Sequence, residues 1–287
     1  MTTVDYAAFY MYNFLISKKR ERVKVKDLKG VKTVLFDLDG TVYLGDRVIG
    51  DTANTLSFLR DRGIKVGFLT NNSSRPRETY IKKLSDLGLY KDTDFFYSSL
   101  DCAEDYFLAE KPDAKIFALA TEKVEKRLKS LGLCVNNEID GCDALLLTFD
   151  TEITYDKIEK ANELLYNKKI LYVATHPDEV CPMENGMIPD VGAFISLFKT
   201  SARRSPDVFT GKPFAVMGKY LLKRFGVKKE EVVMVGDRLS TDIAFGINSG
   251  FTSILVMSGE TKEEDLKKSA VKPDIILKDV DELKKFF

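Results

Sequence analysis

The chain has 287 residues, which is long enough for two domains with a sizeable core. Lys plus Arg and Asp plus Glu both number 44, so the formal net charge is zero, which argues against a nucleic-acid binder that relies on a broad basic field. No window approaches the roughly 20 apolar residues that a membrane span needs. We therefore expect a globular protein with no nucleic-acid partner and no membrane span.

The cysteines and the single histidine limit the metal chemistry. No two cysteines form a CxxC pair, and His176 is the only histidine, which together argue against a zinc site. Scattered thiols are typical of a reducing cytosol, so we expect a cytoplasmic protein. The cysteines are Cys102, Cys134, Cys142 and Cys181.

The first residues form a distinct segment. An apolar and aromatic run, 6-YAAFYMYNFLI-16, precedes a basic run, 18-KKRERVKVK-26. A signal peptide carries its positive charge before the apolar run, so this order argues against one. We expect residues 1–24 to be an N-terminal extension, helical, that packs on the core or on a neighbouring subunit; weak contact with a membrane surface is the alternative.

From residue 31 onward, short apolar runs alternate with helical patterns. The runs are rich in β-branched and aromatic residues and apolar on both faces, as is typical of parallel strands buried under helices. We expect strands at 32–38, 64–70, 94–99, 115–120, 143–149, 170–176, 231–237, 252–258 and 274–277.

The segments between these runs have helical periodicity. Alternation of strands and helices indicates an α/β fold with an open, mostly parallel sheet. Polar, turn-rich stretches near 110–114 and 201–213 are candidate linkers. We expect helices near 52–62, 77–88, 100–110, 122–131, 154–167, 191–202, 214–225, 240–248, 261–269 and 279–286.

Polar side chains follow several of the predicted strands. In open α/β sheets, ligands bind beyond the carboxyl ends of the strands, so these side chains are candidate site residues. The candidates are Asp37 and Asp39 after the first run, Thr70 with Asn71 and Asn72 after the second, Lys212 before a helix, and Asp237 with Asp242 after a later run.

These residue types together suit phosphoryl transfer. Two or three carboxylates with water make an oxygen-rich site for Mg²⁺. A hydroxyl group and backbone amides can hold phosphate oxygens, and a lysine can neutralise them. A carboxylate can attack phosphorus in line, while a second carboxyl group protonates the leaving oxygen and then deprotonates the attacking water.

Each motif also has a structural interpretation. The DxDG sequence resembles half of an EF-hand loop, but that loop would need Asp or Asn at position 41 and Glu at 48, where this chain has Thr41 and Val48. Taken alone, Asp237 and Thr70 would be helix caps, and Lys212 would be a solvated surface lysine. Their joint placement favours the functional interpretation.

The motifs resemble those of the haloacid dehalogenase (HAD) superfamily of phosphohydrolases. The match comprises DLDGT at 37–41, the threonine at the end of a strand at 70, Lys212, and GDRLSTD at 236–242, in the order of that family. The resemblance covers about residues 30–287 and is strongest to the branch of NagD-like and p-nitrophenyl-phosphate phosphatases. The segments that resemble this branch are 67-GFLTNNSSRP-76, 173-VATHPD-178, 211-GKP-213, 236-GDRLSTDI-243 and 258-SGET-261.

The resemblance implies a magnesium site and two catalytic carboxyl groups. Asp37 would be the nucleophile and a Mg²⁺ ligand. Asp39 would be the general acid and base, with its backbone carbonyl as a second ligand. Asp237 would be the third protein ligand, and Asp242 would lie close behind it and orient waters or Lys212.

The resemblance also implies a phosphate site. Thr70, with the Asn71 amide, would bind the phosphoryl group that is transferred, with Asn72 beside them. Lys212 would hold the phosphate and the Asp37 carboxylate.

The family pattern implies a Rossmann-like core with a large inserted α/β cap domain. We expect the core at 25–100 and 208–287 and the cap at 101–207, where closure would exclude water and select the leaving group. The family also suggests a homodimer, often joined through the caps.

The chain departs from the branch where its substrate specificity is expected to lie. His176 stands where the branch usually has Asn, 189-PDVG-192 replaces a glycine-rich P-G-x-G, and Phe214 follows GKP where Ser is usual. His176 is either a packed or helix-capping residue or a substrate-binding residue. The same alternatives apply to three acidic residues, Asp178, Glu184 and Asp190.

The predicted function is a Mg²⁺-dependent phosphatase that hydrolyses a small phosphomonoester through an aspartyl-phosphate. Sugar phosphates, nucleotide monophosphates, glycerol phosphate and pyridoxal phosphate all fit the branch. The alternatives are a phosphomutase, which shares the first motif, and a non-catalytic module that binds phosphate esters on a HAD scaffold. A P-loop kinase is disfavoured because no GxxxxGK[ST] occurs.

Overall fold

The computed structural model describes residues 28–167, 169–183 and 186–287. The predicted N-terminal extension, residues 1–24, and Glu184 lie outside these ranges. The described chain divides into two compact units. The first segment of unit 1 ends at Leu69, and its other segments are Ile81–Phe96 and Leu221–Phe287; unit 2 comprises Thr70–Tyr80 and Tyr97–Tyr220.

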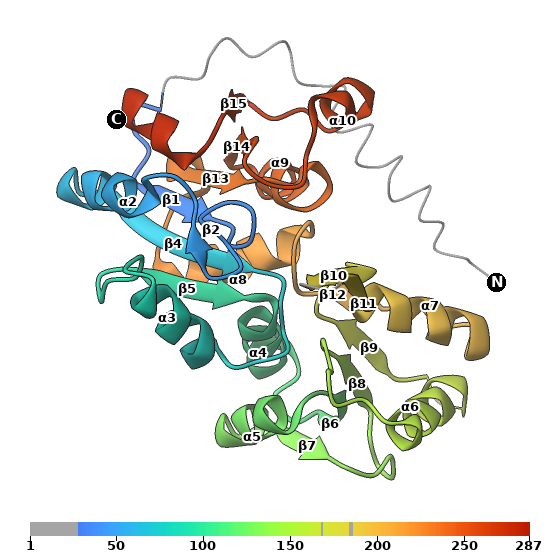
Figure 1. Ribbon diagram of the computed structural model, residues 1–287. Coiled ribbons are helices and arrows are strands. Elements are labelled where there is room, and N and C mark those ends of the chain that lie inside the picture. Colours follow the sequence, from blue (N-terminus) through green and yellow to red (C-terminus); the bar gives the residue numbers. More distant parts are fainter. Residues whose placement is uncertain (1–27, 168, 184–185) are drawn as a thin grey trace. The chain divides into compact units, whose positions relative to one another are not determined.

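A six-stranded sheet carries the first predicted motif. Its order is β15-β14-β13-β1-β4-β5, as Figure 1 shows. Its central strands are buried and mostly apolar, as in TVLF of β1. Such strands are typical of parallel sheets that helices cover on both faces. The strands are β1 (Thr33–Phe36), β4 (Lys65–Thr70), β5 (Phe95–Ser98), β13 (Val232–Gly236), β14 (Thr252–Val256) and β15 (Ile275–Leu277).

The direction of the chain through this sheet reverses between β1 and β13. Phe36 lies opposite Phe68 of β4 on one side and Val235 of β13 on the other, and both pairings are parallel. From β1 the chain proceeds outward to β4 and β5, and it returns later to β13, β14 and β15 on the opposite side. Ligand sites of open α/β sheets lie at such a reversal, beyond the carboxyl ends of the strands.

Close packing fixes the neighbours of this sheet. Gly67 of β4 faces Phe95 so closely that a Cβ at position 67 would overlap the aromatic ring. Arg60 donates to both carboxylate oxygens of Asp94, at 2.9 and 2.6 Å, and so ties α2 to the start of β5. The helical elements that begin or end in unit 1 are α2 (Thr52–Asp61), α3 (Arg77–Asp86), α8 (Ala215–Phe225), a 3₁₀ helix (Lys229–Glu231), a π-helical turn (Leu239–Ile243), α9 (Ala244–Ser249), α10 (Glu263–Lys268) and a second 3₁₀ helix (Val280–Lys285).

Unit 2 contains a second parallel sheet, of five strands. Its order is β12-β9-β8-β6-β7, and every pairing in it is parallel. Here the chain reverses between β6 and β8. The strands are β6 (Lys115–Leu119), β7 (Cys134–Asn136), β8 (Ala144–Leu147), β9 (Leu171–Ala174) and β12 (Val208–Phe209).

Helices cover both faces of the five-stranded sheet. Leu145 and Leu147 of β8 pack in one apolar cluster, and Ala144 and Leu146 pack in another, as the two-residue period of a strand requires. The first cluster includes residues of α6 and α7, and the second includes residues of α4 and α5. These helices are α4 (Ser99–Glu110), α5 (Glu122–Ser130), α6 (Tyr155–Asn167) and α7 (Val191–Ser201).

The α/β fold class with mostly parallel sheets is confirmed, and every strand predicted from the sequence is present. The structure adds strands that were not predicted: β7 and β12, the antiparallel pair β10 (Val180–Met183) and β11 (Gly186–Pro189), and the two-residue strands β2 (Tyr43–Leu44) and β3 (Arg47–Val48). The helix expected near 279–286 is present as a 3₁₀ helix, Val280–Lys285, and the Asp279 side chain caps it by accepting from the Asp281 N–H. Within the described ranges, no helix combines the length and apolarity that crossing a membrane requires.

Candidate active site

Three carboxylates gather at the carboxyl edge of the six-stranded sheet. Asp37, Asp237 and Asp242 each offer an oxygen, and these oxygens lie within 4.8 Å of one another. Asp37 follows β1 directly, and its N–H donates to the Val235 carbonyl at 2.9 Å, which continues the parallel ladder past the end of β1. Asp37 and Asp237 therefore stand side by side where the chain reverses.

The Asp237 side chain is held by backbone. The N–H of Glu260 donates to its Oδ2 at 2.7 Å. Gly40 and Gly259 pack against the same carboxylate so closely that a Cβ at either position would overlap it. The Asp237 carboxylate is almost completely buried, and main-chain atoms hold it in place.

Asp242 lies on a π-helical turn, Leu239–Ile243. Such turns insert an extra residue into a helix and occur often at functional sites. The N–H of Arg238 donates to Asp242 Oδ2 at 3.0 Å, and Gly236 leaves room for the Asp242 side chain. The turn thus directs a buried carboxylate back toward the end of β13.

Asp39 differs from these three residues. It is exposed, and its carboxylate is not part of the three-carboxylate group. The backbone around it turns sharply, since Gly40 N–H donates to the Tyr43 carbonyl at 2.8 Å and Gly40 has a φ of 81°. An exposed carboxyl group two residues from Asp37 is suited to exchanging protons with solvent.

The three-carboxylate group fits a divalent cation. Like charges at this separation repel one another unless a positive charge offsets them, and two of the three groups are buried. Oxygen donors are those that hard cations such as Mg²⁺ and Ca²⁺ select. Asp37, Asp237 and Asp242 would hold such an ion.

Unit 2 brings together three of the residues predicted to bind phosphate. Thr70 ends β4, and its Oγ1 accepts from the Asn72 N–H at 3.1 Å. The Asn71 side chain contacts the Lys212 backbone twice: its Oδ1 accepts from the Lys212 N–H at 2.8 Å, and its Nδ2 donates to the Lys212 carbonyl at 3.0 Å. Gly211 has no space for a side chain beside Asn71, which explains the glycine of the GKP segment.

Asn72 shapes the turn that follows β4. Its Oδ1 accepts from the Ser74 N–H at 3.1 Å, from the Ser74 hydroxyl at 2.7 Å and from the Tyr80 hydroxyl at 2.7 Å. These contacts give the Asn72 side chain a structural task, and a role for Asn72 in binding phosphate stays a prediction.

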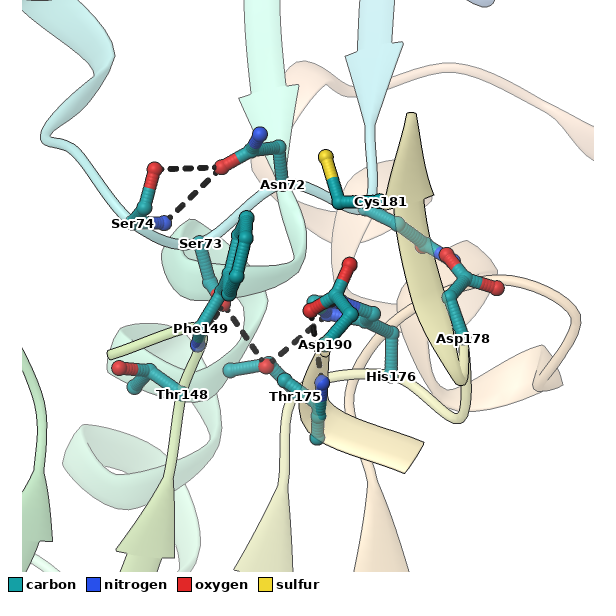
Figure 2. A network of polar contacts seen from close by, with 12 residues as sticks. Asn72, Ser73, Ser74, Thr148, Phe149, Thr175, His176, Asp178, Cys181 and Asp190 are labelled. Atoms are coloured by element: carbon teal, nitrogen blue, oxygen red, sulfur yellow. Dashed lines mark hydrogen bonds and ion pairs between the residues drawn. The ribbon is translucent and has the colours of Figure 1, made fainter. Parts of the chain in front are cut away.

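His176 belongs to a buried chain of hydrogen bonds in unit 2, drawn in Figure 2. Its Nε2 lies 2.9 Å from Asp190 Oδ1, and its Nδ1 lies 3.1 Å from the Thr175 hydroxyl, which is 2.9 Å from the Ser73 hydroxyl. Burial has the largest single effect and by itself would lower the pKa of His176, but the charge and hydrogen bond of Asp190, together with the charge of Asp178, outweigh it, so that the pKa is raised. Both ring nitrogens are engaged and the residue is fully buried, which favours a packing role over the predicted contact with substrate.

The sequence reasoning gave no role to the segment 258-SGET-261, which the structure places against the carboxylates. The Ser258 hydroxyl donates to the Gly40 carbonyl at 2.8 Å, and Gly259 and Glu260 contact Asp237. The signal was available, because this segment follows β14, the strand next to β13.

Comparisons with known proteins agree with this geometry. The family described as haloacid dehalogenase-like hydrolase matches residues 34–134, and a second, HAD-hydrolase-like family matches residues 209–283. An acid sugar phosphatase of Staphylococcus aureus is 32% identical over 255 residues, which cover 89% of this chain and 97% of that protein. The chain therefore belongs to the haloacid dehalogenase-like hydrolases, and it is an enzyme.

Solved structures define the branch more narrowly. A 4-nitrophenylphosphatase of Thermotoga maritima superimposes with a TM-score of 0.86 at 35% identity, covering 91% of this chain and 98% of the other. A p-nitrophenyl phosphatase of Archaeoglobus fulgidus superimposes with a TM-score of 0.83 at 28% identity, covering 90% and 99%. The predicted resemblance to the NagD-like and p-nitrophenyl-phosphate phosphatase branch is confirmed.

Proposed function

We propose that this chain is a Mg²⁺-dependent phosphatase that hydrolyses a small phosphomonoester through an aspartyl-phosphate on Asp37. The observation that carries the proposal is the group formed by Asp37, Asp237 and Asp242 at the point where the sheet reverses. A cluster of like charges fixed by backbone contacts is costly for a fold and useful for binding a cation.

In the first half-reaction, a carboxylate oxygen of Asp37 attacks phosphorus, and the bond to the leaving oxygen breaks. The Asp39 carboxyl group gives its proton to that oxygen, so that the product leaves as a neutral alcohol. In the second half-reaction, the Asp39 carboxylate takes a proton from water, which attacks phosphorus and releases inorganic phosphate and free Asp37.

The remaining residues hold the reactants. Mg²⁺, held by the carboxylates of Asp37, Asp237 and Asp242 and by the Asp39 carbonyl, would neutralise negative charge on the phosphoryl oxygens. Thr70 and the Asn71 amide are assigned to the phosphoryl oxygens, and the Lys212 ammonium group neutralises part of their charge.

The substrate class follows from the relatives. They are named for acid sugar phosphatase and for 4-nitrophenylphosphatase activity, which supports a compact phosphomonoester such as a sugar phosphate, nucleotide monophosphate, glycerol phosphate or pyridoxal phosphate. We assign the choice of leaving group to the inserted segment, residues 101–207. A homodimer in the cytoplasm completes the proposal, and the four cysteines, none of which forms a disulfide, support a reducing compartment.

The test is phosphate release from a panel of phosphomonoesters, measured with Mg²⁺ and again with excess EDTA. We expect release that requires the metal, with one class of ester preferred. Asp37→Asn protein is the control for contaminating phosphatases. Absence of release from every ester would contradict the proposal and favour a phosphomutase or a module that only binds phosphate esters.

A further inference from the structure

The Asn71 side chain makes three hydrogen bonds, two to the Lys212 backbone and one to the Asp178 carboxylate. Its Oδ1 accepts from the Lys212 N–H at 2.8 Å, and one Nδ2 hydrogen goes to the Lys212 carbonyl at 3.0 Å. The second Nδ2 hydrogen goes to Asp178 Oδ2, also at 3.0 Å. The side chain therefore pairs with the Lys212 peptide as a neighbouring strand would, and Asp178 holds its outer edge.

Asp178 can fix the orientation of the Asn71 amide. A carboxylate accepts hydrogen bonds and cannot donate them when ionised, so it selects the Nδ2 side of the amide. If the amide were turned over, its oxygen would face Asp178, and its nitrogen would face the Lys212 N–H. Both contacts would then be repulsive, and the Lys212 peptide would lose its partners.

The backbone of Asp178 is itself held tightly. Its carbonyl accepts from the Gly192 N–H at 2.7 Å, and Gly192 lies so close that a Cβ would overlap the carbonyls of Pro177 and Asp178. One residue further along, the Glu179 carbonyl accepts from the Asp190 N–H at 3.0 Å. The acceptor that Asn71 meets is thus anchored to the N-terminus of α7.

A second contact joins the two ends of the segment that contains the paired strands β10 and β11. His176 and Asp190 flank this segment, and Figure 2 shows the contact between their side chains. His176 Nε2 lies 2.9 Å from Asp190 Oδ1. Asp190 Oδ1 also accepts from the Val191 N–H at 2.7 Å and so caps α7. Hydrogen bonds therefore hold the chain on both sides of Asp178.

We propose that Asp178 is a positioning residue, which fixes the Asn71 side chain and through it the Lys212 peptide. Its expected effect on turnover rests on the proposed function, because Lys212 is the cation assigned to the phosphoryl group. The contacts themselves lie entirely within unit 2 and can be tested without any substrate.

The alternative is that Asp178 acts only through its charge. A negative charge near a phosphate site repels a dianionic ester, and its removal would then strengthen binding. The two roles predict different results for Asp178→Asn, which keeps an oxygen acceptor of nearly the same shape and loses the charge. The positioning role predicts little change, and the charge role predicts stronger binding of phosphate.

The kinetic test compares Asp178→Ala, Asp178→Asn and Glu179→Gln. Asp178→Ala removes the acceptor, and we expect kcat/KM to fall about tenfold to a hundredfold, since small displacements of a group that binds the reacting atoms have effects of this size. Asp178→Asn should keep kcat/KM within about threefold of the unchanged protein. Glu179→Gln removes the same charge from the adjacent exposed residue and should change nothing. Tighter inhibition by inorganic phosphate in both Asp178 variants would overturn the proposal in favour of the charge role.

A double-variant comparison shows whether Asp178 acts through Asn71. In an Asn71→Ala background the contact is already lost, so adding Asp178→Ala should reduce kcat/KM by less than about twofold further. Losses that multiply in the double variant would mean that Asp178 acts independently of Asn71, and the proposal would fail.

Hydrogen exchange of the Lys212 amide tests the arrangement without turnover. This N–H is buried and bonded to Asn71, so it should exchange slowly in the unchanged protein and in Asp178→Asn. It should exchange about tenfold faster in Asp178→Ala, while amides of β8 keep their protection. Equal exchange at Lys212 in all the variants would refute the positioning role, and this result is independent of whether the protein hydrolyses phosphate esters.

Discussion

The two parallel sheets place aspartates at equivalent positions, but the charged groups around these aspartates differ. In the six-stranded sheet, Asp37 and Asp237 follow the two strands that flank the chain reversal, and Asp242 joins them. In the five-stranded sheet, Asp150 follows β8 beside the reversal, where the Lys157 ammonium group lies 2.8 Å from its Oδ2.

At the five-stranded sheet, both oxygens of the Asp150 carboxylate have a partner within the chain. Lys157 also donates to the Ala120 carbonyl, beyond β6, at 2.8 Å, so one lysine spans the ends of the two strands at the reversal. Asp150 Oδ1 accepts from the Glu152 N–H at 2.9 Å, which satisfies the other oxygen. Topology therefore makes a position available at each sheet: at the five-stranded sheet one aspartate pairs with a lysine, and at the six-stranded sheet three carboxylates gather.

The largest effect should come from Asp37→Asn. An amide is a poor nucleophile, so we expect kcat to fall by about 10⁴-fold or more. Asp150→Asn is the matched control at the other sheet and should keep kcat within about threefold. Phosphate release per folded molecule, with folding checked by circular dichroism, measures both. Comparable losses in the two variants would remove the distinction between the sheets.

Asp237→Asn should weaken binding of the divalent ion. Removing one carboxylate from a three-carboxylate group lowers both charge and donor strength, and we expect at least about a hundredfold loss of Mg²⁺ affinity. Isothermal titration calorimetry on the protein without substrate gives the affinity directly. An unchanged affinity would show that these carboxylates are not the metal site.

Much of the fold could be predicted because buried parallel strands leave a plain signal. The run VLF before Asp37 and the run VVMVG before Asp237 are apolar on both faces, and their alternation with helices identifies the fold class. The grouping of Asp37, Asp237 and Asp242 followed from their positions at strand ends and from the family motifs.

The contacts that support the site could not be read in the same way. Asn71 meets Lys212 through backbone atoms, and Asp237 meets the N–H of Glu260, so neither pairing depends on a side-chain type at the partner position. The paired strands β10 and β11 were missed because Pro182 and Pro189 interrupt the strand pattern and because most of their described residues are exposed. The sequence predicts where a strand ends more readily than which distant backbone lies beside it.

Lys157→Met should reduce stability and leave the chemistry intact. It leaves the fully buried Asp150 carboxylate without its cation, and we expect the free energy of unfolding to fall by about 3 kcal/mol. Urea denaturation measures the change, and kcat per folded molecule should be unaffected. The double variant Asp150→Asn/Lys157→Met should recover part of the loss, because it removes the unpaired charge; no recovery would mean that Lys157 stabilises by packing alone.

The smallest effect concerns His176, whose Nε2 lies 2.9 Å from the Asp190 carboxylate. Burial, the largest single effect, and Lys212 oppose the imidazolium form. The charge and hydrogen bond of Asp190 and the charge of Asp178 together outweigh them, so that the pKa of His176 is raised above its ordinary 6.5. A histidine whose pKa is higher in the folded state stabilises the fold fully below pH 6.5, and this stabilisation is lost as the pH rises through the folded-state pKa.

His176→Asn, which restores the residue usual in the branch, removes the titrating group and keeps a donor for Asp190. Urea denaturation between pH 5.5 and about pH 8.5, which is about two units above the usual histidine pKa, gives the free energies of unfolding of the two proteins. As the pH rises, the unchanged protein should lose stability relative to the His176→Asn variant. Other titrating groups cancel in this difference, because they are common to both proteins. If the difference in free energy of unfolding stays constant with pH, or if the unchanged protein gains stability relative to the variant at high pH, then His176 is bonded to Asp190 as a neutral ring and the predicted imidazolium is wrong.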